Sequence, residues 1–328
     1  MRLAVLGCGE MGTTHARIYA GRLKKQVELA MVFSRDPSRA RTLAKEVGAR
    51  PTTNPEDIIA DDSIDAIDLC VPSAYHRKFA VRALDQGKHV LSETPMALTV
   101  ADADAMIAAA RQNRRLLAAA QVMRFVAPYV RARKEVASGG LGKPTMVVAR
   151  RLSRPYWARK RHRSFREYGE PLLELSIHDI DVANWFLGRP NSVLASGVIG
   201  KSGVSEHVLV AISYRGGKAY IEGSGMMPPG FPFTTALRVQ CDRGVLDLMG
   251  QFIEGPIPTE QFHIYAEDGR TSVRVGGRDP YEEECVAFVR CVEKRTGPIA
   301  RSADSERDAL QVAVAAQQSL RGQRPIRL

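Results

Sequence analysis

Three ionisable side chains stand at helical spacing in a largely apolar stretch near the middle of the chain. Glu174, His178 and Asp181 fall at positions i, i+4 and i+7, on one face of a helix predicted from 170 to 187. Burying such groups is costly unless they pair or face a cleft. An imidazole beside carboxylates suits proton transfer near neutral pH. These residues alone leave two interpretations open, an acid/base site and a structural network that braces His178.

A metal site is not expected on this face, because it lacks a second histidine or a cysteine to complete a ligand set. The cysteines are odd in number, scattered and without a Cys-x-x-Cys pair: Cys8, Cys70, Cys241, Cys285 and Cys291. This pattern argues against both a zinc site and a disulfide framework. We expect reduced, structural thiols.

The chain opens with an apolar run that leads into the glycine motif Gly7-Cys8-Gly9-Glu10-Met11-Gly12. The run predicts a strand, and the following residues predict a helix to about residue 23. Glycine permits a tight turn at Gly7, the approach of a pyrophosphate at Gly9 and close helix packing at Gly12. The alternative is a flexible turn. The strand-helix context favours a dinucleotide site at the helix N-terminus, which also includes Glu10 and Met11.

The end of the second predicted strand, 27–33, bears on the choice of cofactor. An acidic residue there would bind the adenosine ribose of NAD and repel a 2′-phosphate. The chain instead has Ser34 and Arg35, with Arg39 one helical turn later. A hydroxyl and guanidinium groups suit a 2′-phosphate through charge-assisted hydrogen bonds. The sequence therefore predicts NADP; NAD stays possible if Asp36 binds the ribose and the arginines only solvate a helix start.

Strand and helix patterns alternate from residue 27 to about 121, which predicts a doubly wound parallel sheet of the Rossmann type. Strands are expected at 27–33, 66–71, 89–91 and 116–120, and helices at 37–47, 75–86 and 100–113. Ligands of such sheets bind at the carboxyl ends of the strands. The segments at these ends supply the remaining cofactor candidates, Val71, Pro72, His76, Glu93 and Gln121. His76 is equally well interpreted as a capping or packing residue.

The alternation stops near Met123, and 328 residues are enough for two hydrophobic cores. We predict an α/β protein with a Rossmann domain at 1–122 and a second domain at 123–328. Helices are expected there at 127–138, 170–187, 282–294 and 303–320. Strands are expected at 145–151, 192–199, 207–214, 218–223, 236–241, 245–248 and 261–266.

A dense run of arginines and aromatic residues spans 150–166 and contains Trp157. Together with the formal net charge of +11, it favours an anionic partner, such as a phosphorylated cofactor or a nucleotide-linked substrate. The alternative is a solvated or interface loop. Nucleic-acid binding is not expected, because no recognised motif accompanies the charge. No apolar run approaches the ~20 residues that span a bilayer and the first segment is a strand, so we expect a cytoplasmic protein without membrane partners.

Four motifs in this order resemble the glucose-fructose oxidoreductase, inositol dehydrogenase and MocA (Gfo/Idh/MocA) family along essentially the whole chain. They are the glycine motif, Val71-Pro72-Ser73-x-x-His76, the segment 87–95 and the segment 175–181. The resemblance implies a Rossmann domain followed by an α+β domain with a large open, mostly antiparallel sheet that pairs subunits into homodimers or homotetramers. It also implies hydride transfer between a nicotinamide and a carbinol or carbonyl carbon of a sugar, cyclitol or related compound.

The resemblance assigns His178 the role of the family's acid/base histidine. Thr94 replaces the lysine of the family's Glu-Lys-Pro motif and brings no positive charge to a developing alkoxide. Glu174 replaces an aspartate that often binds substrate hydroxyls in the family. The candidate substrate contacts are Thr94, Glu174, Arg124, Trp157 and Asp179. The missing lysine leaves a second class open, a catalytically silent regulatory protein that binds the cofactor.

Overall fold

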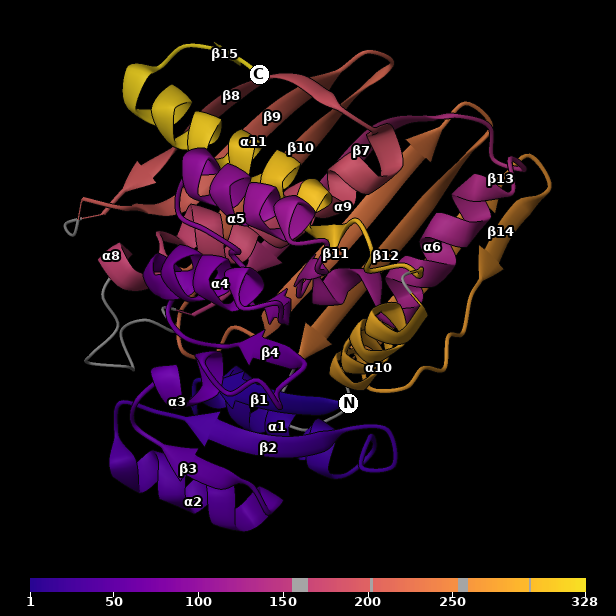
Figure 1. Cartoon of the computed structure of the whole chain (residues 1–328). Helices are drawn as coiled ribbons and strands as arrows, with labels where there is room; N and C mark the ends of the chain where they lie inside the picture. The colour runs from indigo at the N-terminus through magenta and orange to yellow at the C-terminus, as the bar shows by residue number, and fades with distance from the viewer. Residues whose placement is uncertain (155–164, 201–202, 253–258, 295) are drawn as a thin grey trace. The chain divides into compact units, whose positions relative to one another are not determined.

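The computed structural model describes residues 1–154, 165–200, 203–252, 259–294 and 296–328 (Figure 1). These residues form two compact units. The first contains 1–125 and 278–307, and the second contains 126–277 and 308–328. The division predicted at 122/123 differs from this one because the segment 278–307 returns to the first unit. There Phe288 joins the apolar core that also contains Leu3.

The first unit is built on a six-stranded parallel sheet in the order β3-β2-β1-β4-β5-β6. Its strands are β1 Arg2–Leu6, β2 Glu28–Phe33, β3 Arg50–Thr52, β4 Ala66–Leu69, β5 His89–Ser92 and β6 Leu117–Ala119. The order reverses beside β1, so β1 and β4 flank the switch point at which open α/β sheets bind ligands.

Helices follow most strands of this sheet. They are α1 Glu10–Ala20, α2 Pro37–Val47, α3 Glu56–Ile59, α4 His76–Asp85, α5 Val100–Gln112 and α10 Pro280–Lys294. Two 3₁₀ turns, η1 Ser73–Tyr75 and η2 Val122–Arg124, follow β4 and β6. The bounds of α2 agree with the prediction because its end signals are strong. Asp36 accepts hydrogen bonds from the first turn, and Gly48 ends the helix in the left-handed conformation at φ 72°.

The second unit is built on a nine-stranded sheet in the order β14-β13-β12-β11-β7-β10-β9-β8-β15. Only β7 and β10 pair in parallel among the described strands, so the sheet is mostly antiparallel as expected. The strands are β7 Pro144–Leu152, β8 Pro190–Ile199, β9 Ser205–Tyr214, β10 Gly217–Ser224, β11 Phe233–Cys241, β12 Gly244–Phe252, β13 Thr259–Ala266, β14 Gly269–Ser272 and β15 Ile326–Arg327.

One face of this sheet packs against helices, and α9 lies against β7 and β10 (Figure 1). The remaining helical segments are α6 Ala127–Ala137, α8 Phe165–Tyr168, η3 Leu172–Ser176, α9 Ile177–Leu187 and α11 Ser302–Gly322. Helix α11 crosses from the first unit into the second at residues 307/308. None of the described helices is long and apolar enough to cross a membrane.

The helix predicted from 170 to 187 is interrupted near its start. Residues Leu172–Ser176 form a π turn, and the regular helix α9 begins only at Ile177. A π turn bonds residues five apart, so the segment that carries Glu174 departs from the regular helix that the sequence predicted. The turn packs tightly on β10, where a Cβ atom at Gly223 would lie 2.1 Å from the hydroxyl oxygen of Ser176.

Candidate active site

The glycine motif forms a cradle that fits a dinucleotide. Gly7 has a φ of 126°, and a Cβ atom there would meet the carbonyl oxygen of Cys70 at 2.4 Å. A Cβ atom at Gly12 would lie 1.8 Å from the carbonyl oxygen of Gly7, whereas one at Gly9 would meet nothing within 4 Å. Gly9 caps α1 without a side-chain hydrogen bond, which leaves the helix N-terminus open to phosphate. Glu10 and Met11 begin that helix.

Ser34, Arg35 and Arg39 lie together after β2, at the carboxyl edge of the sheet. The carboxylate of Asp36 accepts hydrogen bonds from the backbone N–H groups of Ser38 (2.8 Å) and Arg39 (3.3 Å). It also lies 3.5 Å from the guanidinium of Arg39. The Arg35 guanidinium lies 5.6 Å from the ring centroid of Tyr75. Asp36 is therefore engaged as a helix cap, while both arginines are exposed beside Ser34.

His76 is a packing residue, which corrects its assignment as a cofactor contact. The side chain is buried, and Nε2 lies 2.7 Å from the carbonyl oxygen of Val71. Burial lowers the pKa of His76 to about 4, so the ring is neutral and its Nε2–H donates to Val71. Nδ1 lies 3.2 Å from the Ser92 hydroxyl oxygen and 3.2 Å from the carbonyl oxygen of Met96. His76 thus fixes the backbone at Val71, which with Pro72 stays partly exposed after β4.

Glu93 and Thr94 follow β5, and their hydrogen bonds are made within the first unit. The backbone N–H of Thr94 donates to the Glu93 carboxylate at 3.0 Å. The Thr94 hydroxyl donates to the carbonyl oxygen of Ala120 at 2.9 Å. That hydroxyl therefore offers a ligand its lone pairs and not its proton. Gln121 is buried with its amide donating to Glu306, so it supports the rim, and Arg124 is partly buried on η2.

The second unit holds His178 beside a buried ion pair. The guanidinium of Arg151 on β7 donates two hydrogen bonds to Asp179, at 3.0 and 3.1 Å. Asp179 is fully buried, which corrects its assignment as a substrate contact. Burial and the nearby Arg151 guanidinium lower the pKa of His178 to about 3. His178 itself is partly exposed at the start of α9, and with this pKa its ring is neutral at physiological pH.

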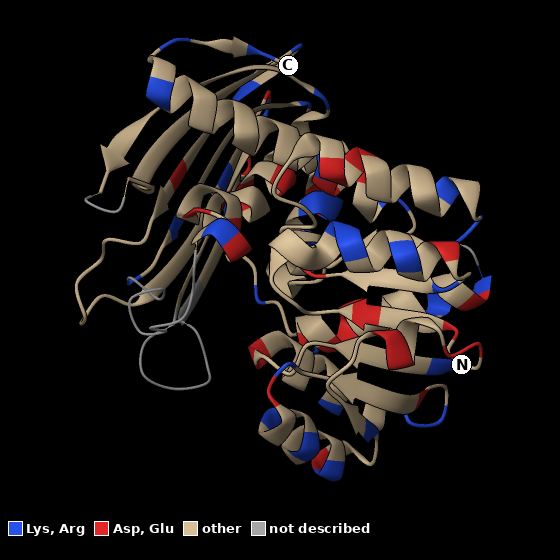
Figure 2. Ribbon diagram, turned by 60° about the vertical axis from the view of Figure 1, so that its left-hand side comes forward, with Lys and Arg blue, Asp and Glu red and all other residues tan. Residues whose placement is uncertain are grey.

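The other residues predicted for the substrate site differ in burial, and Trp157 is not among the described residues. Glu174 is partly exposed within the π turn, and Asp181 is buried on α9. Trp157 lies outside the described residues, as does most of the basic run, 155–164. At its near end Arg154 donates to the carbonyl oxygen of Pro229 at 2.8 Å. In the described part, Lys and Arg are interspersed with Asp and Glu along the helices (Figure 2).

The chain matches two family descriptions. Residues 1–121 match "Oxidoreductase family, NAD-binding Rossmann fold", and residues 129–247 match the Gfo/Idh/MocA C-terminal domain. The chain belongs to the Gfo/Idh/MocA family. This family assignment confirms the predicted fold class. It also identifies the protein as a nicotinamide-dependent oxidoreductase that acts on CH–OH groups.

Curated relatives and solved structures of the family cover most or all of the chain. The myo-inositol 2-dehydrogenase of Thermotoga maritima is 25% identical to this chain, and the match covers 100% of this chain and 98% of the relative. The D-xylose 1-dehydrogenase (NADP(+)) 2 of Haloferax volcanii is 30% identical over 83% of each chain. The aldose-aldose oxidoreductase structure from Caulobacter crescentus has a TM-score of 0.85 at 23% identity, covering 100% and 99%. This last likeness shows the shared fold.

The Rossmann unit also contains a set of buried ionisable residues that was not predicted from the sequence. His15, Asp68 and Glu284 are each at most 1% exposed. Asp68 could have been noticed, because it is a charged residue inside the apolar strand β4, where an unpaired carboxylate would be costly. Glu284 carried no such signal, because it lies on a helix near the end of the chain that the sequence assigned to the other domain.

Proposed function

We propose that this protein is an NADP-dependent oxidoreductase that transfers a hydride between the nicotinamide and a carbinol carbon of a sugar, cyclitol or sugar derivative. The preference for NADP rests on one arrangement. Asp36 is engaged in capping α2, while Ser34, Arg35 and Arg39 present one hydroxyl and two guanidinium groups at the position of the adenosine ribose. A 2′-phosphate would accept their charge-assisted hydrogen bonds.

The chemistry assigned to the chain's own residues is proton transfer and orientation. When bound, the cofactor supplies the carbon that accepts or releases the hydride. His178 accepts the hydroxyl proton of the substrate during oxidation, since a ring with a pKa of about 3 is neutral at physiological pH. Glu174 orients neighbouring hydroxyl groups from the π turn. Thr94 positions the reacting group through a lone pair, because its proton is given to Ala120.

The substrate class follows from the family members. Relatives are named for inositol, D-xylose and UDP-N-acetylglucosamine, and their shared chemistry is a secondary or hemiacetal hydroxyl on a polyhydroxylated ring. The net charge of +11 favours phosphorylated or nucleotide-linked members of this class. The basic run at 150–166 is the segment that we propose would bind such a phosphate.

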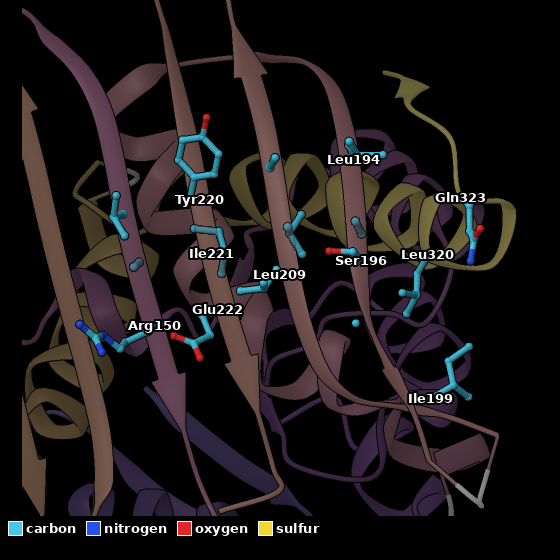
Figure 3. A pocket seen from close by; sticks show the side chains of 16 residues that line it. Arg150, Leu194, Ser196, Ile199, Leu209, Tyr220, Ile221, Glu222, Leu320 and Gln323 are labelled. Atoms are coloured by element: carbon cyan, nitrogen blue, oxygen red, sulfur yellow. The ribbon is translucent and has the colours of Figure 1, made fainter.

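We further propose that the protein forms a homo-oligomer through the open face of the nine-stranded sheet. That face exposes large apolar side chains, including Met146, Val148, Leu194, Leu209 and Tyr220. A hollow of about 780 Å³ lies on it. Its lining side chains include Arg150, Tyr220 and Gln323 (Figure 3). Exposed apolar surface of this kind marks protein interfaces. Sedimentation of Leu209→Glu, compared with Glu206→Gln on the same strand, tests the proposal; wild-type monomers at micromolar concentration would contradict it.

The function is tested by following the absorbance of the reduced nicotinamide with each cofactor and a panel of cyclitols, aldoses and nucleotide-linked sugars. We expect turnover on at least one class, with kcat/KM higher for NADP than for NAD. Arg39→Gln should weaken NADP binding by about tenfold and leave NAD binding nearly unchanged, whereas Arg41→Gln on the same helix is the control. Equal or tighter binding of NAD by the wild type would contradict the cofactor assignment. Tight cofactor binding without turnover would favour the silent regulatory protein.

A further inference from the structure

The Rossmann unit contains a cluster of ionisable side chains that the proposed reaction does not use. We call it the buried acid cluster, and it brings together two helices and two strand ends. Its members are His15 and Tyr19 of α1, Asp68 of β4 and Cys70 just after it, Glu93 just after β5, and Glu284 and Cys285 of α10. All of them belong to the first unit.

Asp68 and His15 form the centre of the cluster. Their side chains are fully buried, and His15 Nδ1–H donates to the Asp68 carboxylate at 2.9 Å. The hydroxyl of Tyr19 donates to the same carboxylate at 2.8 Å, and the thiol of Cys70 donates to it at 3.1 Å. Asp68 and the other carboxylates nearby raise the pKa of His15 to about 10, against the opposing effect of burial. His15 is therefore a cation that balances the Asp68 carboxylate.

Glu93 connects this centre to the carboxyl edge of the sheet. One of its carboxylate oxygens lies 3.6 Å from His15 Nε2, and the other accepts the N–H of Thr94. Its side chain is 17% exposed, in contrast to the fully buried side chains of His15 and Asp68. A charge on Glu93 thus interacts electrostatically both with the cluster and with groups at the sheet edge where the cofactor would bind.

Glu284 makes no comparable contact. It is 1% exposed, and neither of its carboxylate oxygens has a hydrogen-bond partner in the described part of the chain. Burial, with the carboxylates of Glu93 and Asp68 nearby, raises the pKa of Glu284 well above its usual range. His15 opposes this effect. With Glu284 protonated, the cluster carries the charges of His15, Asp68 and Glu93 and has a net charge of −1 when Glu93 is ionised.

The cluster includes residues at the carboxyl ends of β4 and β5, on the side of the switch point where the nicotinamide half of a bound cofactor would lie. The pyrophosphate binds at the turn between β1 and α1, and the adenosine half lies toward β2, where Ser34 and Arg35 are found. The nicotinamide half would therefore extend toward the ends of β4 and β5, which are followed by Cys70 and Glu93. The nicotinamide ring has a positive charge only in its oxidised form. A carboxyl group within about 4–6 Å of a new positive charge releases its proton more readily.

We propose that the buried acid cluster is a proton-binding site linked to the oxidation state of the cofactor. The carboxyl group of Glu284 interacts electrostatically with His15 and Glu93. It releases its proton to solvent when the oxidised, cationic nicotinamide binds. It keeps the proton when the reduced, neutral form binds. No bond other than the carboxyl O–H breaks, and no further reactant is consumed. Glu284 is a positioning residue in this account, since it acts on the ring through Glu93. The proposal rests on nicotinamide binding and not on the choice between NADP and NAD.

The test compares the dissociation constants of NADP⁺ and NADPH between about pH 6 and about pH 9. The 2′-phosphate is common to both forms, so its own titration cancels in the ratio. In the wild type, the dissociation constant of NADP⁺ should fall relative to that of NADPH as the pH rises, by up to about tenfold per pH unit for one proton. Glu284→Gln should make the ratio independent of pH. Glu283→Gln, the same change on the neighbouring, partly exposed residue, should behave as the wild type. A wild-type ratio without pH dependence, or an unchanged slope in Glu284→Gln, would overturn the proposal.

A second measurement needs no variant. Calorimetric titrations of the wild type in buffers with different ionisation enthalpies count the protons released on binding. We expect more proton release with NADP⁺ than with NADPH, by up to about one proton per site. Equal release for the two forms would contradict the proposal. Repeating the titrations with NAD⁺ and NADH separates this result from the cofactor preference, because the same difference is expected for both pairs.

Discussion

The guanidinium of Arg151 forms two hydrogen bonds with the carboxylate of Asp179, the residue that follows His178. Both partners are buried, so the pair ties the start of α9 to β7 and fixes the backbone that carries His178. The pair also explains why Asp179 cannot serve the substrate. Burial lowers the pKa of His178, and the same guanidinium lowers it further by opposing a second positive charge.

Removing one partner of this pair is expected to destabilise the second unit. Arg151→Gln leaves the Asp179 carboxylate buried without its counter-ion, which costs about 3–5 kcal/mol. The double variant Arg151→Gln with Asp179→Asn replaces the ions by neutral amides and should recover most of this loss. Urea unfolding followed by circular dichroism measures both effects. A single variant as stable as the wild type would show that the pair does not hold α9.

The stability of the Rossmann unit is expected to fall in alkaline solution because of His15. Its pKa is raised from 6.5 to about 10 in the folded state, so its contribution is fully present below 6.5 and is lost as the pH rises through about 10. The free energy of unfolding should decrease across this window by up to about 1.4 kcal/mol per pH unit. His15→Gln should be less stable at pH 6 and lose less on going to pH 9. Parallel pH curves for variant and wild type would contradict this assignment.

Two glycines of the cradle should respond differently to alanine. A Cβ atom at Gly9 meets nothing within 4 Å, so Gly9→Ala should fold normally but raise the cofactor dissociation constant by about tenfold, because the methyl group blocks the pyrophosphate. Gly12→Ala places a Cβ atom 1.8 Å from the Gly7 carbonyl oxygen and should lower stability by about 1–3 kcal/mol. Melting curves and cofactor titrations of the two variants distinguish these roles. Unchanged binding in Gly9→Ala would place the pyrophosphate elsewhere.

Thr94→Lys should increase kcat for polyol oxidation by about tenfold, because an ammonium group stabilises the developing alkoxide. Thr94→Met adds a side chain of similar length without charge and should not raise kcat. Steady-state rates at saturating cofactor provide the comparison. If lysine brings no gain over methionine, another cation already serves the reacting oxygen.

Local sequence signals were sufficient for much of the fold. The glycine motif and the alternating apolar pattern predicted the parallel sheet and most of its helices. The sequence predicted a regular helix and not the π turn at Leu172–Ser176, which packs against Gly223, a residue far away in sequence.

The roles of individual site residues were also decided by contacts that are distant in sequence. Asp179 and His76 matched family motifs, yet their polar atoms contact other parts of the protein. The Asp179 carboxylate binds Arg151, and the His76 ring contacts Val71 and Ser92. Helix α10 joined the Rossmann core because its apolar face, including Phe288, is buried there. Neither composition nor periodicity identifies the partner of a buried group, which tertiary packing determines.

Isotope transfer tests the proposed reaction most directly. The substrate identified in the panel of cyclitols and sugars would be labelled with deuterium at the carbinol carbon. Mass spectrometry would then follow the label into the nicotinamide. We expect wild-type protein to transfer the label to NADP, and His178→Gln to transfer it at a rate lower by a factor of about 10²–10⁴, the usual contribution of a general acid/base. Absence of label in the reduced cofactor, or an unchanged rate in His178→Gln, would contradict hydride transfer with His178 as the acid/base.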